Sequence, residues 1–100
     1  MLLRERGIEA EEVVATLAQK FAEAGYSNRT EIVDATEFKF VVAVGGGELT
    51  VTVRRLPDRR LGPTLRLPRT TTEIACRDID RGLLEELTEL IDRSLIRGGG

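Results

Sequence analysis

Residues 38–53 read FKFVVAVGGGELTVTV, which is two alternating stretches joined by three glycines. Phe38 and Phe40 take every second position before the glycines, and Val51 and Val53 do the same after them. This period of two is typical of a β-strand that buries one face. Glycine reaches positive φ without steric cost, so the triple glycine predicts a tight turn. The stretch therefore predicts a β-hairpin whose apolar face is directed at the core.

The two strands of this hairpin extend beyond the quoted stretch. The first is predicted over 30–44 and the second over 48–55. Continuing the alternation backwards places Ile32 on the apolar face, but also the polar residues Asp34 and Thr36. We therefore expect a bulge or break in the first strand around these two polar residues.

A third strand is predicted over 70–77. It begins with β-branched threonines, which favour strands, and continues with Ile74 and Cys76 on one face. Because Cys76 shares the parity of Ile74, we expect it to be a buried core cysteine.

Amphipathic helices are predicted over 8–25 and 80–97, near the two ends of the chain. In each segment the apolar residues recur with the helical period and form one stripe. Asp80 is expected to be the N-cap of the second helix. Gly25 stands where the first helix would end in a left-handed residue.

These elements predict an α+β fold, a two-layer sandwich in the order α-β-β-β-α. An antiparallel sheet carries both helices packed on one face. The chain is expected to form a single domain over 1–100, with 1–7 as an N-terminal extension and 98–100 as a flexible tail. The core face is expected to hold Phe38, Phe40, Val42, Val51, Val53 and Ile74. The opposite, milder face is expected to show Lys39, Val41, Ala43, Thr50, Thr52, Thr71 and Ala75.

Residues 54–69 read RRLPDRRLGPTLRLPR and differ from the rest of the chain. The segment holds six of the 13 arginines, all three prolines and one acid, for a net charge of +5, while the remaining residues carry −7. Proline cannot donate to a sheet ladder, so this segment is predicted to be a basic loop or arm. Only a short edge strand around 65–67 is compatible with the prolines.

The arginines of this segment suggest contact with nucleic acid, specifically RNA. An arginine fork pairs with two phosphate oxygens at once. The candidate contact residues are Arg54, Arg55, Arg59, Arg60, Arg66 and Arg69. No aromatic residue lies between them, so the segment has no aromatic ring on which a base could stack. The competing interpretation is that the arginines pair with acids of the same chain. The acids available on the last helix are Glu85, Glu86, Glu89 and Asp92.

The leucines of the same segment suggest a protein contact instead. They are Leu56, Leu61, Leu65 and Leu67. Exposed apolar patches mark interaction surfaces, and arginine is itself enriched at interfaces. This alternative describes an assembly subunit, which is a homodimer or a small component of a larger complex. It would be joined through the mild sheet face and the leucine-bearing arm.

The usual catalytic groups are missing from the sequence. There is no histidine to activate Cys76 as a nucleophile. Glu73, Asp78 and Asp80 are acids near the start of the last helix, where helix capping explains the two aspartates better than metal binding. The sequence therefore predicts a non-catalytic binding domain without a metal or cofactor.

The composition also bears on location. One cysteine, no apolar run of about 20 residues and a short, charged N-terminus predict a cytoplasmic protein with no membrane contact. A high charge content with few thermolabile residues is typical of thermophiles.

The predicted element order is shared by double-stranded-RNA-binding domains, in which a lysine-rich run begins the last helix. Here residues 77–81 read RDIDR, with two acids at that place. The similarity is one of topology alone, so no residue role is transferred from that family.

Overall fold

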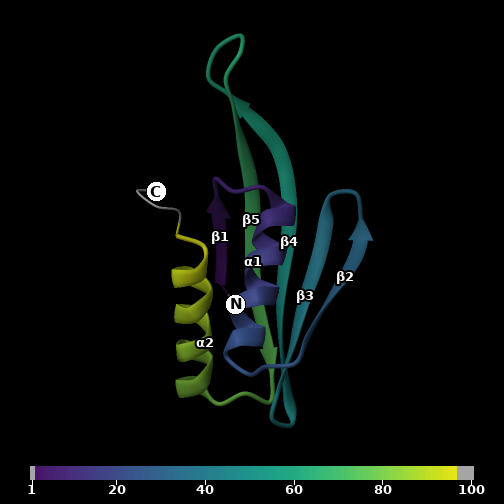
Figure 1. Ribbon diagram of the computed structural model, residues 1–100, viewed down its shortest axis with the longest axis vertical. Helices are drawn as coiled ribbons and strands as arrows, with labels where there is room; N and C mark the ends of the chain where they lie inside the picture. The colour runs from purple at the N-terminus through teal and green to yellow at the C-terminus, as the bar shows by residue number, and fades with distance from the viewer. Residues whose placement is uncertain (1, 97–100) are drawn as a thin grey trace.

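The computed structural model describes residues 2–96, which form one antiparallel five-stranded sheet and two helices. The elements are β1 (Leu2–Arg6), α1 (Ala10–Glu23), β2 (Asn28–Asp34), β3 (Glu37–Val44), β4 (Gly47–Arg60), β5 (Arg66–Arg77) and α2 (Arg81–Ser94). The strand order across the sheet is β1-β5-β4-β3-β2, and both helices lie on one face (Figure 1). The α+β class and the two-layer arrangement are confirmed. The flexible tail expected at 98–100 and the last residue of the predicted helix lie outside the described residues.

The sheet has two more strands than the sequence predicted. The segment expected to be an N-terminal extension is β1, an edge strand. It pairs antiparallel with β5, with Arg6 opposite Thr70 at one end of the pairing. The strand predicted over 30–44 is two strands, because the break expected near Asp34 is a full reversal of the chain. Asp34 Oδ1 accepts hydrogen bonds from the backbone nitrogen and the hydroxyl of Thr36, both at 2.7 Å. This local bond closes the turn between β2 and β3.

The core lies between the sheet and both helices. Five of the six residues expected on the core face are buried, and Phe38 is partly buried. Phe21 of α1 stands at the centre, with its ring 5.5 Å from that of Phe40 and 5.8 Å from that of Tyr26. From α2, Leu87 and Ile91 join the same cluster. One continuous core therefore holds the two layers together.

Two side chains expected in the core are exposed. Ile32 is 75% exposed because it stands opposite the partly buried Phe38 on the outermost strand, β2. Cys76 is also exposed, so the expectation of a buried core cysteine is wrong. It lies one residue before the end of β5, where the chain turns toward α2 through Asp78 at φ 57°. Its cross-strand partner Leu49 is fully buried, so the exposure of Cys76 belongs to the end of β5 and not to this face of the sheet.

Both expected helix ends are confirmed. Asp80 Oδ1 accepts from the backbone nitrogens of Gly82 at 2.9 Å and Leu83 at 3.2 Å, as an N-cap does. Gly25 has φ 89°, and its nitrogen donates to the carbonyl of Ala22. The nitrogen of Tyr26 donates to the carbonyl of Phe21. These two bonds complete a Schellman motif at the end of α1.

A polar layer ties β1 and α2 to the sheet. The Arg6 side chain is only 12% exposed and donates to Thr72 Oγ1 at 3.0 Å and to Asp92 Oδ1 at 2.8 Å. The buried Thr70 hydroxyl donates to the carbonyl of Ile8. Because each buried polar group has a partner, this layer avoids the cost of an unsatisfied donor.

The turn between β3 and β4 contains a glycine with no room for a side chain. A Cβ on Gly47 would lie 2.3 Å from the carbonyl oxygen of Arg77 and 2.4 Å from that of Asp78. On the neighbouring Gly46, an added Cβ would meet no described atom within 4 Å. The third glycine of the turn therefore allows the end of β5 to approach β4.

We expect Gly47→Ala to lower the free energy of unfolding by about 1–3 kcal/mol, because backbone atoms must move to admit the methyl group. The matched control Gly46→Ala should change it by less than about 0.5 kcal/mol. Urea unfolding of both variants measures this difference. Equal stabilities would contradict the close approach of β5 to the turn.

Candidate interaction site on the β4–β5 arm

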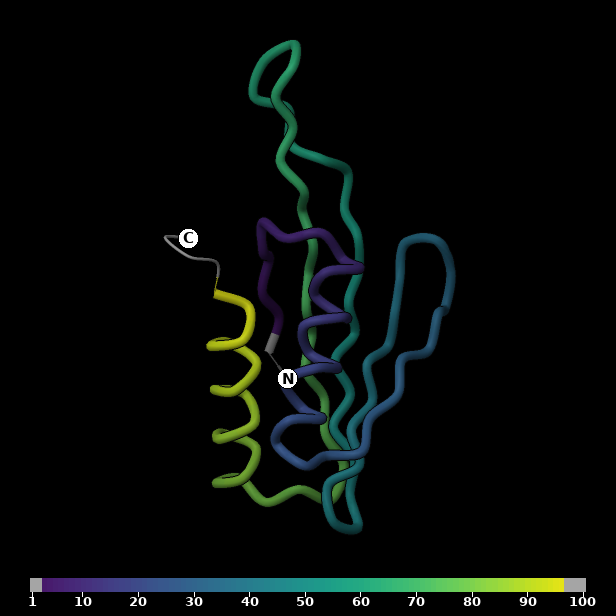
Figure 2. Tube along the Cα trace, in the orientation of Figure 1, coloured from purple at the N-terminus to yellow at the C-terminus, as the bar shows by residue number. Residues whose placement is uncertain are grey.

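The basic segment is a β-ribbon and not a loop. Pairing of β3 with β4 ends at Arg54, and pairing of β1 with β5 begins at Thr70. Beyond these points β4 and β5 continue as a two-stranded ribbon that rises past both helices (Figure 2). We call residues 55–69 the arm. The sequence allowed only a short edge strand around 65–67, whereas strand structure extends to Arg60 in β4 and begins at Arg66 in β5.

The arm accommodates its prolines because, from Leu56 to Arg69, no other described strand pairs with its outer edges. The register shifts between Leu56 and Arg59, so Pro57 lies in a bulge. The backbone nitrogen of Leu61 donates to the carbonyl of Leu65 at 2.9 Å, which fixes the alternation of inward and outward groups along β5. By this alternation the nitrogen of Pro68 faces the free edge, where no ladder bond is lost.

The two faces of the arm carry different side chains. Residues paired across antiparallel strands share a face, and neighbours along a strand alternate. Arg59 pairs with Leu67 and Arg60 with Arg66, while the bond from Leu61 to Leu65 continues the ladder. One face therefore holds Arg59 and three leucines, and the other holds Arg60 and Arg66. The leucines are exposed by 51% (Leu61), 52% (Leu65) and 41% (Leu67), and the fourth candidate, Leu56, is half-buried.

Three of the six candidate arginines are held by acids of the same chain. Arg54 pairs with Glu37 at 2.8 Å and Arg69 with Glu5 at 3.0 Å. Arg55 pairs with Glu11. Self-pairing was one interpretation of the sequence, but it assigned the acids of the last helix. The observed acids belong to β3, β1 and α1 and stand around the base of the arm.

The remaining arginines are Arg59, Arg60 and Arg66. Within residues 2–96 they form no ion pair. Arg59 contributes only a weak Coulombic effect on Glu5. Their charges are therefore the ones available to a partner. The pairing of Arg54 with Glu37 follows from the hairpin register, but no sequence signal pointed to the acids that hold Arg55 and Arg69.

The ion pairs shift the pKa values of the acids at the base. The hydrogen bond from Arg69 lowers the pKa of Glu5, and that from Arg55 lowers the pKa of Glu11. The same bonds raise the pKa of both guanidinium groups. The four side chains are 37–61% exposed, so each pair adds little stability.

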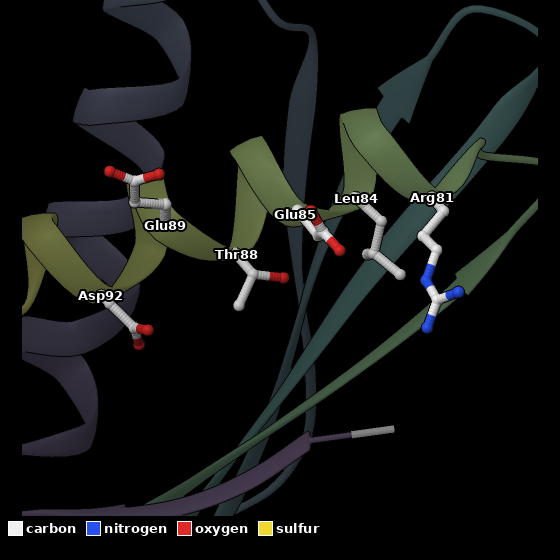
Figure 3. A pocket seen from close by; sticks show the side chains of 6 residues that line it. All are labelled: Arg81, Leu84, Glu85, Thr88, Glu89 and Asp92. Atoms are coloured by element: carbon white, nitrogen blue, oxygen red, sulfur yellow. The ribbon is translucent and has the colours of Figure 1, made fainter.

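A groove with a volume of about 360 Å³ lies beside α2. It is lined by residues of α2, namely Arg81, Leu84, Glu85, Thr88, Glu89 and Asp92 (Figure 3). Asp92 is engaged by Arg4 and Arg6, and Glu89 by Arg93. Two of the acids that line the groove are therefore engaged by arginines of the same chain.

The acids considered for metal binding are not brought together. Glu73 stands opposite Thr52 on the open sheet face, and Asp80 caps α2. In the described part of the chain no three His, Cys, Asp or Glu residues are grouped to hold a metal ion. The helices of residues 2–96 include none long and apolar enough to span a membrane.

The sequence matches no protein-family model and no curated protein sequence. The arm is therefore assigned as the candidate site from its geometry and charge.

We expect Arg69→Gln to raise the pKa of Glu5 toward the ordinary carboxyl value, because the charged hydrogen bond is lost. The matched control Arg66→Gln, at the outer end of the arm, should leave it unchanged. Carboxyl-carbon NMR titration measures both.

The sign of the pH dependence follows from the lowered pKa of Glu5 in the folded state. Its pair stabilises the fold above the ordinary carboxyl pKa of about 4.3. That contribution is lost as the pH falls through the lowered pKa. If Glu5 titrates identically in the wild type, Arg69→Gln and Arg66→Gln, the ion pair between Glu5 and Arg69 does not form.

Proposed function

We propose that this protein is a non-catalytic, cytoplasmic interaction domain that binds a protein partner through the leucine face of the arm. The observation that carries the proposal is the row of three exposed leucines, Leu61, Leu65 and Leu67, on one side of a projecting ribbon. Burying a leucine fully is worth roughly 1.5–3 kcal/mol. Because each of these side chains is about half exposed, a partner that covers it would gain about half of that free energy.

The position of the arm supports this proposal. No other element of the described chain pairs with it beyond Leu56, so a partner can approach it from both faces. Arg59 flanks the leucines, and arginine is enriched at protein interfaces. The partner surface that fits is an apolar groove with an acidic rim.

The chemistry of the chain supports a binding role over a catalytic one. The sequence has no histidine, and its one thiol, Cys76, is exposed on the far end of β5. An exposed thiol without a disulfide partner fits the reducing cytoplasm.

A second candidate function is contact with nucleic acid, favoured by Arg60 and Arg66 side by side on the other face of the arm. A two-stranded ribbon fits the major groove of B-form DNA, whereas the major groove of A-form RNA is too narrow. Contact with RNA would therefore involve single strands. The number of available arginines is small, and the acidic body opposes the approach of phosphates.

Photo-crosslinking in the native cells tests the protein-binding proposal. With benzoylphenylalanine in place of Leu65 we expect one reproducible partner, and with the same group in place of the exposed Glu86 on α2 we expect none. With that partner purified, Leu65→Ser combined with Leu67→Ser should raise the dissociation constant at least about tenfold. Arg60→Gln combined with Arg66→Gln, on the opposite face, is the matched control and should change it less. Unselective crosslinking, or equal affinities of the leucine variant and wild type, would contradict the proposal.

Fluorescence anisotropy separates the two candidate functions. The probes are labelled single-stranded RNA, double-stranded RNA and duplex DNA across a salt series. One outcome favours nucleic acid: the logarithm of the binding constant falls with the logarithm of the salt concentration with a slope of about −2 to −3. If Arg60→Glu with Arg66→Glu also abolishes this binding and the leucine variant keeps it, the second candidate replaces the protein-binding proposal. No binding at low salt would remove the second candidate.

A further inference from the structure

The outer edge of the sheet at β2 carries unpaired backbone N–H and C=O groups on every second residue. Ala43 nitrogen donates to the carbonyl of Ser27 at 3.0 Å, and Asn28 stands opposite Val42. This pattern makes the pair of Asn28 and Val42 a non-hydrogen-bonded one. By alternation along β2, the N–H and C=O groups of Asn28, Thr30 and Ile32 point away from β3. Among the described strands none takes up these groups.

The charges of β2 are self-complementary in one register. Arg29 and Glu31 lie on the open face of the sheet, on either side of Thr30, and are 2.9 Å apart as an exposed pair within one chain. An exposed pair of this kind is weak, so either side chain can exchange its partner for one on a second copy. If a second copy of the chain lies antiparallel with the two-fold axis at Thr30, each Thr30 exchanges both backbone bonds with its counterpart. Asn28 of each copy then pairs with Ile32 of the other, also through outward groups. In the same register Arg29 of one copy stands opposite Glu31 of the other.

Neighbouring registers are excluded by the same charges. A shift of two residues in one direction places Glu31 opposite Glu31 of the second copy, and a shift in the other direction places Arg29 opposite Arg29. Like charges directly opposite each other destabilise a sheet, whereas opposite charges stabilise it. Charges on an edge strand ordinarily discourage pairing. Here their alternating signs discourage the two neighbouring registers and favour the one centred on Thr30.

Exposed apolar side chains mark the same edge. Ile32 is 75% exposed and Val33 is 51% exposed. Asn28 Nδ2 donates to the carbonyls of Ala18, at 3.5 Å, and Tyr26, at 3.3 Å, so it lies beneath the end of α1. Pairing of Ile32 with Asn28 of the second copy would therefore place the isoleucine beside the C-terminal end of that copy's α1.

We propose that two copies of this chain form a two-fold dimer by antiparallel pairing of their β2 edges, with the axis at Thr30. The two sheets become one continuous ten-stranded sheet. The surface is separate from the arm, so the proposal is independent of the proposed function. The two-fold relation directs the two arms in opposite directions, and the dimer offers both to partners.

Sedimentation velocity across a concentration series tests the dimer. We expect the mass to rise from 11.1 kDa toward twice that value. Thr30→Pro removes the outward N–H and keeps the ladder with β3 whole, so it should give a monomer with an unchanged circular dichroism spectrum. The matched control Thr30→Val keeps the N–H and should keep the dimer. The arm variant Leu65→Ser with Leu67→Ser should also keep it.

A charge exchange tests the register. Glu31→Arg alone and Arg29→Glu alone should each raise the dimer dissociation constant about tenfold or more, since each places like charges opposite each other twice. An equimolar mixture of the two variants restores opposite charges at every pair and should form a heterodimer. A strict monomer at all concentrations, or a dimer that Thr30→Pro and the single charge variants leave unchanged, would overturn the proposal.

Discussion

The long pairing of β4 with β5, interrupted only by the bulge at Pro57, is the constraint on which the rest of the structure depends. It runs from Glu48 opposite Arg77 to Arg60 opposite Arg66. On one side β4 carries β3 and then β2, and on the other side β5 carries β1. The same two strands supply Val51, Val53 and Ile74 to the core and the buried threonines of β5 to the polar layer. Body and arm are thus two parts of one long hairpin, so the arm needs no core of its own.

The sequence predicted the elements whose signals are local. The hairpin at 38–53 has a strict period of two around its glycines, and the caps Asp80 and Gly25 act on backbone groups within three residues or so. β1 was not predicted, because five residues acquire strand structure only through pairing with a segment about 70 positions away. The length of the strands in the arm was not predicted. Proline disrupts a ladder only where the N–H that it lacks would have pointed toward the neighbouring strand. Which N–H groups face inward depends on tertiary pairing.

The candidate site was predicted in its residues but not in its organisation. Arginines and leucines were recognised as two alternative sets. Their distribution over the two faces, with Arg59 beside the leucines and Arg60 beside Arg66, depends on the bulge at Pro57, which sets the register of the outer arm. The acids Glu5 and Glu11 reach the base of the arm only because β1 and α1 pack beside it. Neutralising Arg55 and Arg69 there leaves a short outer end with three leucines and three free charges.

Two-dimensional NMR of the free protein tests the central claim, which is that residues 55–69 form a paired ribbon. Arg60 and Arg66 form a non-hydrogen-bonded pair, in which the two Cα atoms approach to about 4.5 Å. The account predicts a strong Overhauser contact between their Hα protons and slow exchange of the Leu61 amide relative to its neighbours. Random-coil shifts through 56–69 without that contact would contradict it and would return the segment to a loop.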